Sequence, residues 1–285
     1  MKLRGKVAIV TGASKGIGKA IAETFAREGC SLTVASRNLD EIKKVGEELK
    51  DKYGFDVLPV MCDVSNPSDV EKMVKKTIGR YKRIDILVNN AGIYGPFGPF
   101  ADNDLELWQK TIAINLMGTV ICTKFVLPQM IRAKRGKIIN LSGGGSGGPP
   151  TPTISAYVTS KVAVVRFTEV IAEEVKGYNI QVNSIAPGAV NTRLLNQVLE
   201  AQDKIDKKFL ERSLKQKETG GIPLEKAADL ALFLASDESD GITGKLISAV
   251  WDDYGKFADR LGEINGTQIY TLRRIDNEVY KEVRK

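Results

Sequence analysis

The first apolar run of the chain passes directly into a glycine-rich turn, KVAIVTGASKGIG, which spans residues 6–18. Val and Ile dominate the run, as expected of a strand that is buried on both faces. The glycines let the backbone turn tightly and approach a pyrophosphate, and the helix predicted from Gly16 presents its free N–H groups and positive dipole end to that anion. A glycine-rich triplet alone would fit any strand-to-helix turn. Placed after the first strand of a βαβ pattern, it predicts a dinucleotide site.

The rest of the chain continues the alternation of short apolar runs with longer amphipathic stretches. The runs predict strands at Lys6–Thr11, Ser31–Ser36, Val57–Cys62, Ile84–Asn89, Gly136–Ser142, Ile180–Ala186 and Lys245–Ser248. The amphipathic stretches predict helices at Gly16–Glu28, Leu39–Tyr53, Pro67–Tyr81, Asp104–Arg132, Ser155–Lys176 and Leu224–Ser236. This alternation implies right-handed crossovers. We therefore predict an α/β fold, a Rossmann-type doubly wound parallel sheet of about seven strands, in one domain over residues 1–250.

Three segments interrupt the alternation. Residues 143–152 are rich in Gly and Pro, and a charged insertion occupies residues 188–222. Within the insertion, Gln197–Glu218 has helical periodicity and fits either a lid over a substrate or a solvated helix. A C-terminal extension over 251–285 contains an amphipathic piece at Tyr254–Leu261 and a strand-like piece at Gln268–Leu272. Its aromatic residues, Trp251, Phe257 and Tyr270, should pack on the domain, on a partner subunit or at the mouth of the cleft.

The composition excludes several classes of function. The 285 residues include no histidine, which removes Ser-His-Asp hydrolysis, Cys-His proteolysis and the HExxH zinc site. The three cysteines, Cys30, Cys62 and Cys122, are far apart and predict neither disulfides nor a metal site. Any proton transfer must therefore use Tyr, Lys, Asp, Glu, Cys or water, and a reducing, cytoplasmic location is expected.

The excess of positive charge does not indicate a polymer partner. The formal charge of +7 comes from 42 Lys and Arg against 35 Asp and Glu, and acidic residues are interleaved around nearly all the basic doublets. A nucleic-acid surface needs its basic charge gathered on one face. The N-terminus has no signal-peptide core, and no apolar run approaches the roughly 18 residues of a spanning helix. We expect no nucleic-acid partner and no membrane.

Five motifs follow one another along the chain: TGASKGIG at 11–18, NNAG at 89–92, Asn115, YVTSK at 157–161, and Pro187-Gly188. Together they make residues 3–250 resemble the short, single-domain branch of the short-chain dehydrogenase/reductase family. The resemblance implies hydride transfer between a nicotinamide dinucleotide and a small-molecule carbonyl or alcohol. It also implies a homodimer or homotetramer assembled through the long helices predicted at Asp104–Arg132 and Ser155–Lys176.

The charge pattern favours NADP over NAD. An NAD site places an acid near the end of the second strand, where it repels a 2′-phosphate. Here that strand ends Ala35-Ser36-Arg37-Asn38, and the glycine-rich loop carries Lys15. These two cations suit a 2′-phosphate, unless both are solvated surface residues. By resemblance, Asp63 and Val64 contact the adenine.

Together, the loop, the charges and the resemblance give one set of predicted cofactor-binding residues. They are Gly12, Ser14, Lys15, Gly16, Ile17, Gly18, Ser36, Arg37, Asn38, Asp63, Val64, Asn89, Ala91, Gly92, Tyr157, Lys161, Pro187, Gly188, Val190 and Thr192. Thr192 could donate to the nicotinamide carboxamide or to a phosphate, or could serve only as a helix N-cap.

Tyr157 and Lys161 are the predicted catalytic pair. Spaced four apart on a predicted helix, they share a face one turn apart. A nearby ammonium and an oxidised nicotinamide favour the phenolate, which lowers the pKa of the phenol and makes it a usable acid and base. By resemblance, Lys161 also holds the nicotinamide ribose and Asn115 helps to hold a water that leads to solvent. A satisfied buried amide is the alternative for Asn115.

The sequence departs from the family where a serine usually binds the substrate oxygen. The family reads Asn-x-Ser-Ser after the fifth strand, whereas this chain reads NLSGGGS over residues 140–146. The serine position falls on Gly143 when aligned from the left and on Gly144 when counted back from Tyr157. Ser142 is the predicted substitute and Ser146 a weaker one, with backbone N–H groups of the glycine run as the alternative.

The function predicted from the sequence is an NADP(H)-dependent oxidoreductase in which Tyr157 is the general acid and base. A non-catalytic dinucleotide-binding redox sensor is the alternative, because the serine is displaced. Sugar-nucleotide epimerase chemistry would need a larger C-terminal domain. The substrate pocket is expected to be lined by Tyr94, Phe97, Pro149, Pro150, Leu194 and Leu195.

Overall fold

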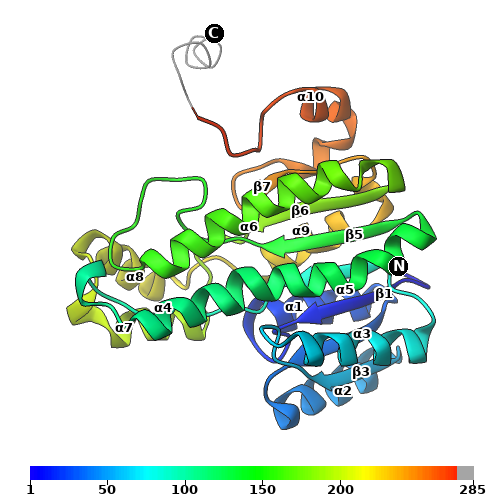
Figure 1. Cartoon of the computed structure of the whole chain (residues 1–285), viewed down its shortest axis with the longest axis horizontal. Coiled ribbons are helices and arrows are strands. Elements are labelled where there is room, and N and C mark those ends of the chain that lie inside the picture. The colour runs from blue at the N-terminus through cyan, green and yellow to red at the C-terminus, as the bar shows by residue number, and fades with distance from the viewer. Residues whose placement is uncertain (275–285) are drawn as a thin grey trace.

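A single parallel sheet of seven strands in the order β3-β2-β1-β4-β5-β6-β7 forms the centre of the computed structural model, which describes residues 1–274 (Figure 1). The strands are β1 Val7–Thr11, β2 Ser31–Ser36, β3 Val57–Met61, β4 Ile86–Asn89, β5 Gly136–Leu141, β6 Ile180–Ala186 and β7 Leu246–Ser248. The order changes direction between β1 and β4, which pair directly. Ligands of doubly wound sheets bind outside the carboxyl ends of the strands at this switch point.

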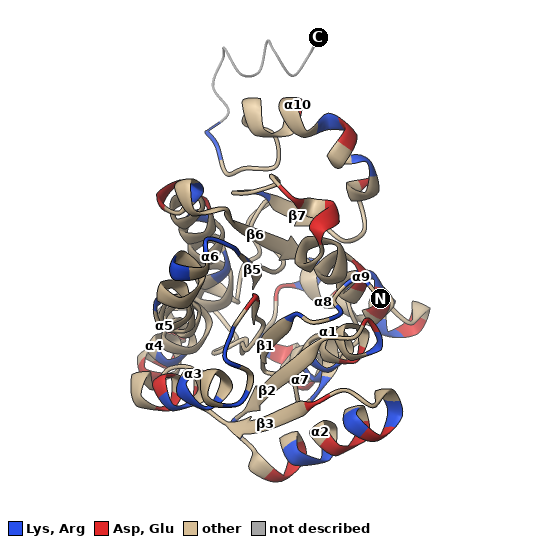
Figure 2. Ribbon diagram, turned by 90° about the vertical axis from the view of Figure 1, so that its right-hand side faces the viewer, with Lys and Arg blue, Asp and Glu red and all other residues tan. Residues whose placement is uncertain are grey.

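Helices cover both faces of the sheet, as Figure 2 shows in end view. One face carries α1 Gly16–Arg27, α2 Leu39–Tyr53 and α9 Leu224–Ala235, and the other carries α3 Pro67–Tyr81, α4 Leu105–Ile112, α5 Gly118–Ala133 and α6 Ser155–Glu174. Each layer packs on the sheet through its own apolar cluster. The strands are continuous apolar runs because both of their faces are buried. The predicted fold class and its elements are confirmed, with end points moved by one or two residues.

The predicted helix Asp104–Arg132 contains an irregular turn at its centre. Residues Ala113–Met117 form a π-helical turn between α4 and α5. Such turns are frequent at functional sites, and this one contains Asn115. By length and composition, the whole stretch Leu105–Ala133 meets the criteria for a membrane-spanning helix, which the sequence analysis did not find. That is weak evidence of a membrane, because α5 packs against β4 and β5 and buried core helices meet the same criteria.

The charged insertion folds into two short helices near the carboxyl ends of the strands, α7 Arg193–Glu200 and α8 Lys207–Thr219. A bridge between Val190 and Ile222 joins the two ends of the insertion. The side chains of Thr192 and Asp206 cap the two helices by accepting hydrogen bonds from backbone N–H groups.

The C-terminal extension, described as far as residue 274, packs on the domain. Phe257 and Ile264 are fully buried in the cluster that contains α1 and α9, and Ile264 belongs to α10 Leu261–Gly266. The strand predicted at Gln268–Leu272 is absent, although the Tyr270 carbonyl accepts a hydrogen bond from the backbone N–H of Leu246 beside β7. Trp251 does not pack on the domain, because 86% of this residue is exposed, and its packing on a partner subunit stays a prediction. Residues 275–285 lie outside the described part of the extension.

Candidate active site

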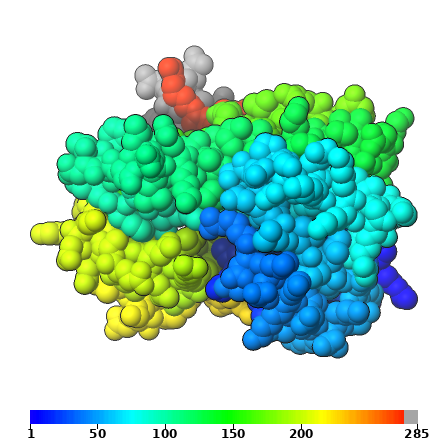
Figure 3. All heavy atoms as spheres, turned by 60° about the horizontal axis from the view of Figure 1, so that its bottom comes forward, coloured from blue at the N-terminus to red at the C-terminus, as the bar shows by residue number. Residues whose placement is uncertain are grey.

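A cleft of about 390 Å³ opens at the carboxyl ends of β1, β2 and β4. In Figure 3 it appears as a hollow between the blue N-terminal residues and the yellow-green residues of the insertion. Many of the predicted cofactor-binding residues line it: Gly12, Ser14, Lys15, Gly16, Ile17, Ser36, Arg37, Asn38, Asp63, Val64, Ala91, Gly92 and Thr192. The structure therefore brings the glycine-rich loop, the ends of β2 and β3, the NNAG motif and the start of α7 to one cleft.

The glycine-rich loop is fitted closely to the NNAG motif. A Cβ on Gly12, whose φ is +63°, would lie 2.8 Å from the Ala91 Cα, and one on Gly18 would lie 2.3 Å from the Asn90 Nδ2. The Asn90 amide fills this space and donates hydrogen bonds to the carbonyls of Thr11 and Gly12 at 2.9 and 3.0 Å. Only glycine fits at these two positions, and the close fit holds the N-terminus of α1 toward the cleft.

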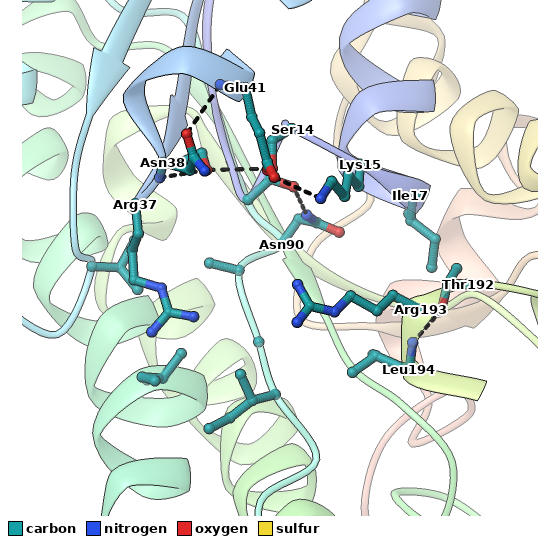
Figure 4. A pocket seen from close by; sticks show the side chains of 18 of the residues that line it. Ser14, Lys15, Ile17, Arg37, Asn38, Glu41, Asn90, Thr192, Arg193 and Leu194 are labelled. Carbon is teal, nitrogen blue, oxygen red and sulfur yellow. Dashed lines mark hydrogen bonds and ion pairs between the residues drawn. The ribbon is translucent and has the colours of Figure 1, made fainter. Parts of the chain in front are cut away.

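Charged side chains gather at the β2 end of the cleft. Lys15 pairs with Glu41 at 2.7 Å, and this contact lowers the pKa of the Glu41 carboxyl. In Figure 4, Arg37 from the end of β2 and Arg193 from α7 approach the space from opposite sides. Burial acts to raise the pKa of Asp63, but hydrogen bonds from Ser65 and the charge of Arg37 outweigh it and lower that pKa. Three cations and two carboxylates therefore line this end.

The remaining predicted cofactor residues, Gly18, Asn89, Tyr157, Lys161, Pro187, Gly188 and Val190, are not part of the cleft lining. Asn89 is buried, donates to Asn140 and Thr123, and leaves its own Oδ1 without a partner among the described residues. A Cβ on Gly188 would lie 2.7 Å from a methyl of Val250, so this glycine allows the close approach of the chain after β7.

Several lining residues were not among the predicted cofactor-binding residues: Glu41, Cys62, Asn90, Ile93, Ile114, Arg193, Leu194 and Gln197. Leu194 was expected at the substrate pocket instead. Asn90 could have been inferred, because it lies inside the NNAG motif. Arg193 directly follows Thr192, which caps α7 and lines the cleft, so both of the roles considered for Thr192 are compatible with its position. Glu41 reaches the cleft from the first turn of α2, and no pattern in the sequence marks it.

Lys161 lies directly behind the lining of the cleft. Only 5% of it is exposed, and its Nζ donates a hydrogen bond to the carbonyl of Leu141 at the end of β5, at 2.7 Å. A Cβ on Gly92 would lie 3.5 Å from the same Nζ. Gly92 thus gives the ammonium access to the cleft, and burial lowers the pKa of Lys161 to about 8.

Tyr157 lies one helical turn before this lysine, with 7% of it exposed. The Lys161 Nζ is 5.8 Å from the Tyr157 ring centre, and the ring of Tyr94 is 4.4 Å from it on another side. The sequence predicts a lowered pKa for Tyr157, but in the structure burial, followed by the nearby Tyr94, raises it. Burial has this effect because it removes the water that would solvate the charged phenolate.

Asn115 is held by the chain that follows the NNAG motif. Its Oδ1 accepts from the Ile93 N–H and its Nδ2 donates to the Ile93 carbonyl, both at 2.9 Å. The same Nδ2 donates to the Ser160 hydroxyl, which donates to the Tyr157 carbonyl. The amide is therefore satisfied by protein groups, and it fixes the backbone of a residue that lines the cleft. Its role in holding a water stays a prediction.

Ser142 and Ser146, the predicted substitutes for the family's serine, are hydrogen-bonded to each other. The Ser146 hydroxyl donates to the Gly143 carbonyl at 2.7 Å, so the contact of 2.6 Å between the two serine Oγ atoms is a donation from Ser142. The residue that faces Tyr157 is Gly143, because a Cβ there would lie 2.2 Å from the Tyr157 hydroxyl. When the sequence is aligned from the left, the position of the family's serine is therefore occupied by Gly143, whose α-carbon lies against the Tyr157 hydroxyl.

Comparisons with known proteins agree on one family. A family model described as short chain dehydrogenase matches residues 6–203. The 3-oxoacyl-acyl-carrier-protein reductase FabG of Thermotoga maritima is 38% identical over 253 residues, which cover 87% of this chain and 97% of the relative.

Two solved structures share the fold and are named with a nicotinamide dinucleotide. One is an NAD+-bound xylitol dehydrogenase, with a TM-score of 0.79 and 31% identity over 87% of this chain and 98% of the other. The second is a 7α-hydroxysteroid dehydrogenase in complex with NADH and 7-oxo glycochenodeoxycholic acid, with a TM-score of 0.77 and 29% identity over 87% and 93% of the two chains.

Proposed function

Because this chain belongs to the short-chain dehydrogenase/reductase family of oxidoreductases, we propose that it transfers a hydride between NADP(H) and a small-molecule carbonyl or alcohol. One observation carries the proposal. Lys161 lies behind Gly92 at the wall of a cleft lined by the glycine-rich loop, and Tyr157 stands one helical turn away. A buried acid-base pair beside a dinucleotide-shaped cleft is suited to proton transfer coupled to hydride transfer.

Tyr157 would move the proton in this reaction. Burial keeps its phenol neutral, so it carries the proton that a carbonyl oxygen needs during reduction. Giving up this proton leaves a phenolate, which the positive charge of Lys161 stabilises. In the reverse direction that phenolate accepts the proton of the alcohol and becomes the neutral phenol again. The bound nicotinamide supplies or accepts the hydride. The Leu141 carbonyl anchors the lysine so that its remaining N–H groups can hold the nicotinamide ribose.

We propose NADP rather than NAD because cations outnumber carboxylates at the β2 end of the cleft. β2 ends at Ser36 and Arg37, where an acid would repel a 2′-phosphate. Lys15 is paired with Glu41, but both side chains are exposed and exposed ion pairs contribute little, so a phosphate can replace the carboxylate at small cost. Asp63 and Val64 line the same cleft, which supports their predicted contact with the adenine, and the N-terminus of α1 also lines it and would bind the pyrophosphate.

The same proposal extends to assembly and location. Apolar side chains are exposed on the helices that the resemblance assigns to subunit contacts, namely Leu105 on α4, Met117 in the π-helical turn and Val170 on α6. They support a homodimer or homotetramer. The three cysteines are free and buried, which supports a reducing, cytoplasmic location.

Consumption of NADPH tests the proposed activity. Purified protein should oxidise NADPH in the presence of at least some members of a panel of ketones and aldehydes, followed by the loss of reduced-nicotinamide absorbance. NADH should support a lower rate at equal concentration. Tight NADPH binding with no turnover across the panel, or with alcohols and NADP+ in the reverse assay, would favour the redox-sensor alternative instead.

A further inference from the structure

In the proposed reaction a second hydrogen-bond donor would polarise the substrate carbonyl, and the residue that faces Tyr157 has no side chain to supply it. Gly143 presents only its α-carbon to the Tyr157 hydroxyl. The Ser142 proton is donated to Ser146, and the Ser146 proton to the Gly143 carbonyl. One donor beside the general acid polarises the carbonyl and holds its oxygen in place, and loss of such a donor is costly in known sites.

Tyr94 is the polar side chain that contacts the ring of Tyr157. The two ring centres are 4.4 Å apart and the planes are inclined at 43°, so the rings touch without stacking. The hydroxyls of both tyrosines make no hydrogen bond within residues 1–274, so both can donate to a ligand. Burial raises the pKa of Tyr94 to about 12, which keeps its phenol protonated at neutral pH.

The backbone on each side of Tyr94 is held firmly. Before it, the two hydrogen bonds of Asn115 fix Ile93. After it, Gly95 has φ +84°, and a Cβ there would lie 2.0 Å from the Thr111 Oγ1, so the loop lies directly against α4. Phe97 packs on the other side of the ring at 5.5 Å. A side chain held in this way is preorganised, as a group that binds a transition state should be.

We propose that the Tyr94 hydroxyl binds the substrate oxygen in this protein and so takes the place of the serine that Gly143 lacks. The proposal rests on the function proposed above. In carbonyl reduction the carbon receives the hydride, the oxygen receives the proton of Tyr157, and Tyr94 donates a hydrogen bond without losing its own proton. Its ring packs on Phe97, and both rings belong to residues that the sequence predicts at the substrate pocket.

The Tyr94→Phe variant tests this directly, because it removes the hydroxyl and keeps the ring. We expect kcat to fall on the order of 100-fold, the cost of losing one such donor, with NADPH affinity unchanged when measured by nucleotide fluorescence. Tyr178→Phe is the matched control, since Tyr178 lies on the surface beyond α6 and should leave kcat unchanged. A kcat for Tyr94→Phe within about threefold of wild type, with Tyr157→Phe inactive, would overturn the role of Tyr94 and leave the proposed function standing.

A second pair of variants separates the hydrogen bond from the packing of the ring. Leu and Gln are close in size, but only Gln can donate a hydrogen bond. If Tyr94 acts as a donor, Tyr94→Gln should keep a clearly higher kcat than Tyr94→Leu at equal NADPH affinity. Equal kcat values in the two variants would contradict the proposal and assign the donor to Ser142, Ser146 or the backbone N–H groups of the glycine run. Inactivity of the wild-type protein would instead count against the proposed function itself.

Discussion

Arg37 is the residue through which the proposed preference for NADP over NAD can be tested most directly. Its guanidinium faces the cleft from the end of β2, and charge-assisted hydrogen bonds to a phosphate contribute roughly 1.5–3 kcal/mol. Arg37→Ser should therefore weaken NADPH binding by about 10- to 100-fold and change NADH binding little, as measured by fluorescence titration. Arg27→Ser, at the exposed end of α1, removes the same charge away from the cleft and should change neither affinity. Equal losses for both nucleotides would contradict a role in 2′-phosphate recognition.

The pKa of Lys161 predicts how the reaction depends on pH. Burial lowers this pKa from 10.5 to about 8, so the ammonium is lost as the pH rises through that value. In the proposed mechanism the charged form holds the ribose and stabilises the phenolate, so kcat/KM for carbonyl reduction should fall above about pH 8. Lys161→Arg cannot lose its proton in this range. The variant should be slower, but its profile should lack this decline; an unchanged decline would assign it to another group.

At the residue scale, the sequence predicted which side chains lie close together better than it predicted their surroundings. The YVTSK spacing placed Tyr157 and Lys161 on one helical face, and the structure agrees. The sequence predicted a shift of the Tyr157 pKa in the wrong direction. The shift depends on how completely α6 and the loop around Tyr94 exclude water from the phenol, which the sequence does not show. The contact between Ser142 and Ser146 depends on the path of a glycine-rich loop, for which hydrophobic periodicity gives no information.

At the scale of elements, the glycine-rich loop and the NNAG motif act as one unit. Gly12→Ala would place a methyl group 2.8 Å from the Ala91 backbone at a positive φ. We expect loss of NADPH binding, together with a stability loss of about 2–4 kcal/mol from strain and overpacking. Both are measured on one sample, by fluorescence and by urea denaturation.

Gly54→Ala is the control for Gly12→Ala. Gly54 also has a positive φ, +74°, but a Cβ there would meet nothing within 4 Å. It should lose about 1–2 kcal/mol of stability from backbone strain alone and should bind NADPH normally. If the two alanine variants behave alike, the close fit of the loop to Ala91 is not what shapes the cleft.

The positions of the strands and helices were largely predictable from the sequence. Which of their residues meet at the cleft was predictable only in part. Apolar runs and capped helices gave strand and helix positions to within a residue or two, because each element is buried in a periodic way. The sequence did not predict that Glu41 and Arg193 line the cleft. These residues belong to α2 and α7, which are far apart in the chain and lie on different sides of the cleft. The π-helical turn around Asn115 was missed because an inserted residue leaves the apolar pattern of a long helix almost unchanged.

At the scale of the whole molecule, the C-terminal extension is part of the core. Phe257 is 1% exposed and packs in the apolar cluster that contains residues of α1 and α9. Phe257→Ala should therefore lower the free energy of unfolding, measured by urea denaturation, by about 3–5 kcal/mol. Trp251 lies six residues earlier and is 86% exposed. Trp251→Ala should change stability by less than about 0.5 kcal/mol. Similar losses for the two variants would show that the extension does not pack as described.

Composition alone made Trp251 and Phe257 equal candidates for burial. Which of them is buried depends on where the chain turns after β7. Trp251 lies in a turn that is closed by the Ser248 hydroxyl, which accepts from its backbone N–H. Phe257 follows a short 3₁₀ turn that brings it back to the domain. Turn geometry of this kind depends on tertiary contacts. The sequence therefore predicted the range of the extension but not which of its residues pack on the domain.

The most direct test of the proposed function is the kinetics of Tyr157→Phe, which removes only the phenol oxygen of this buried residue. With a carbonyl substrate found in the panel assay, turnover should fall about 10²- to 10⁴-fold, the usual contribution of a general acid. The Kd for NADPH should stay within about twofold of wild type. A Tyr157→Phe variant that turns over at the wild-type rate would contradict the assignment of the proton transfer to Tyr157.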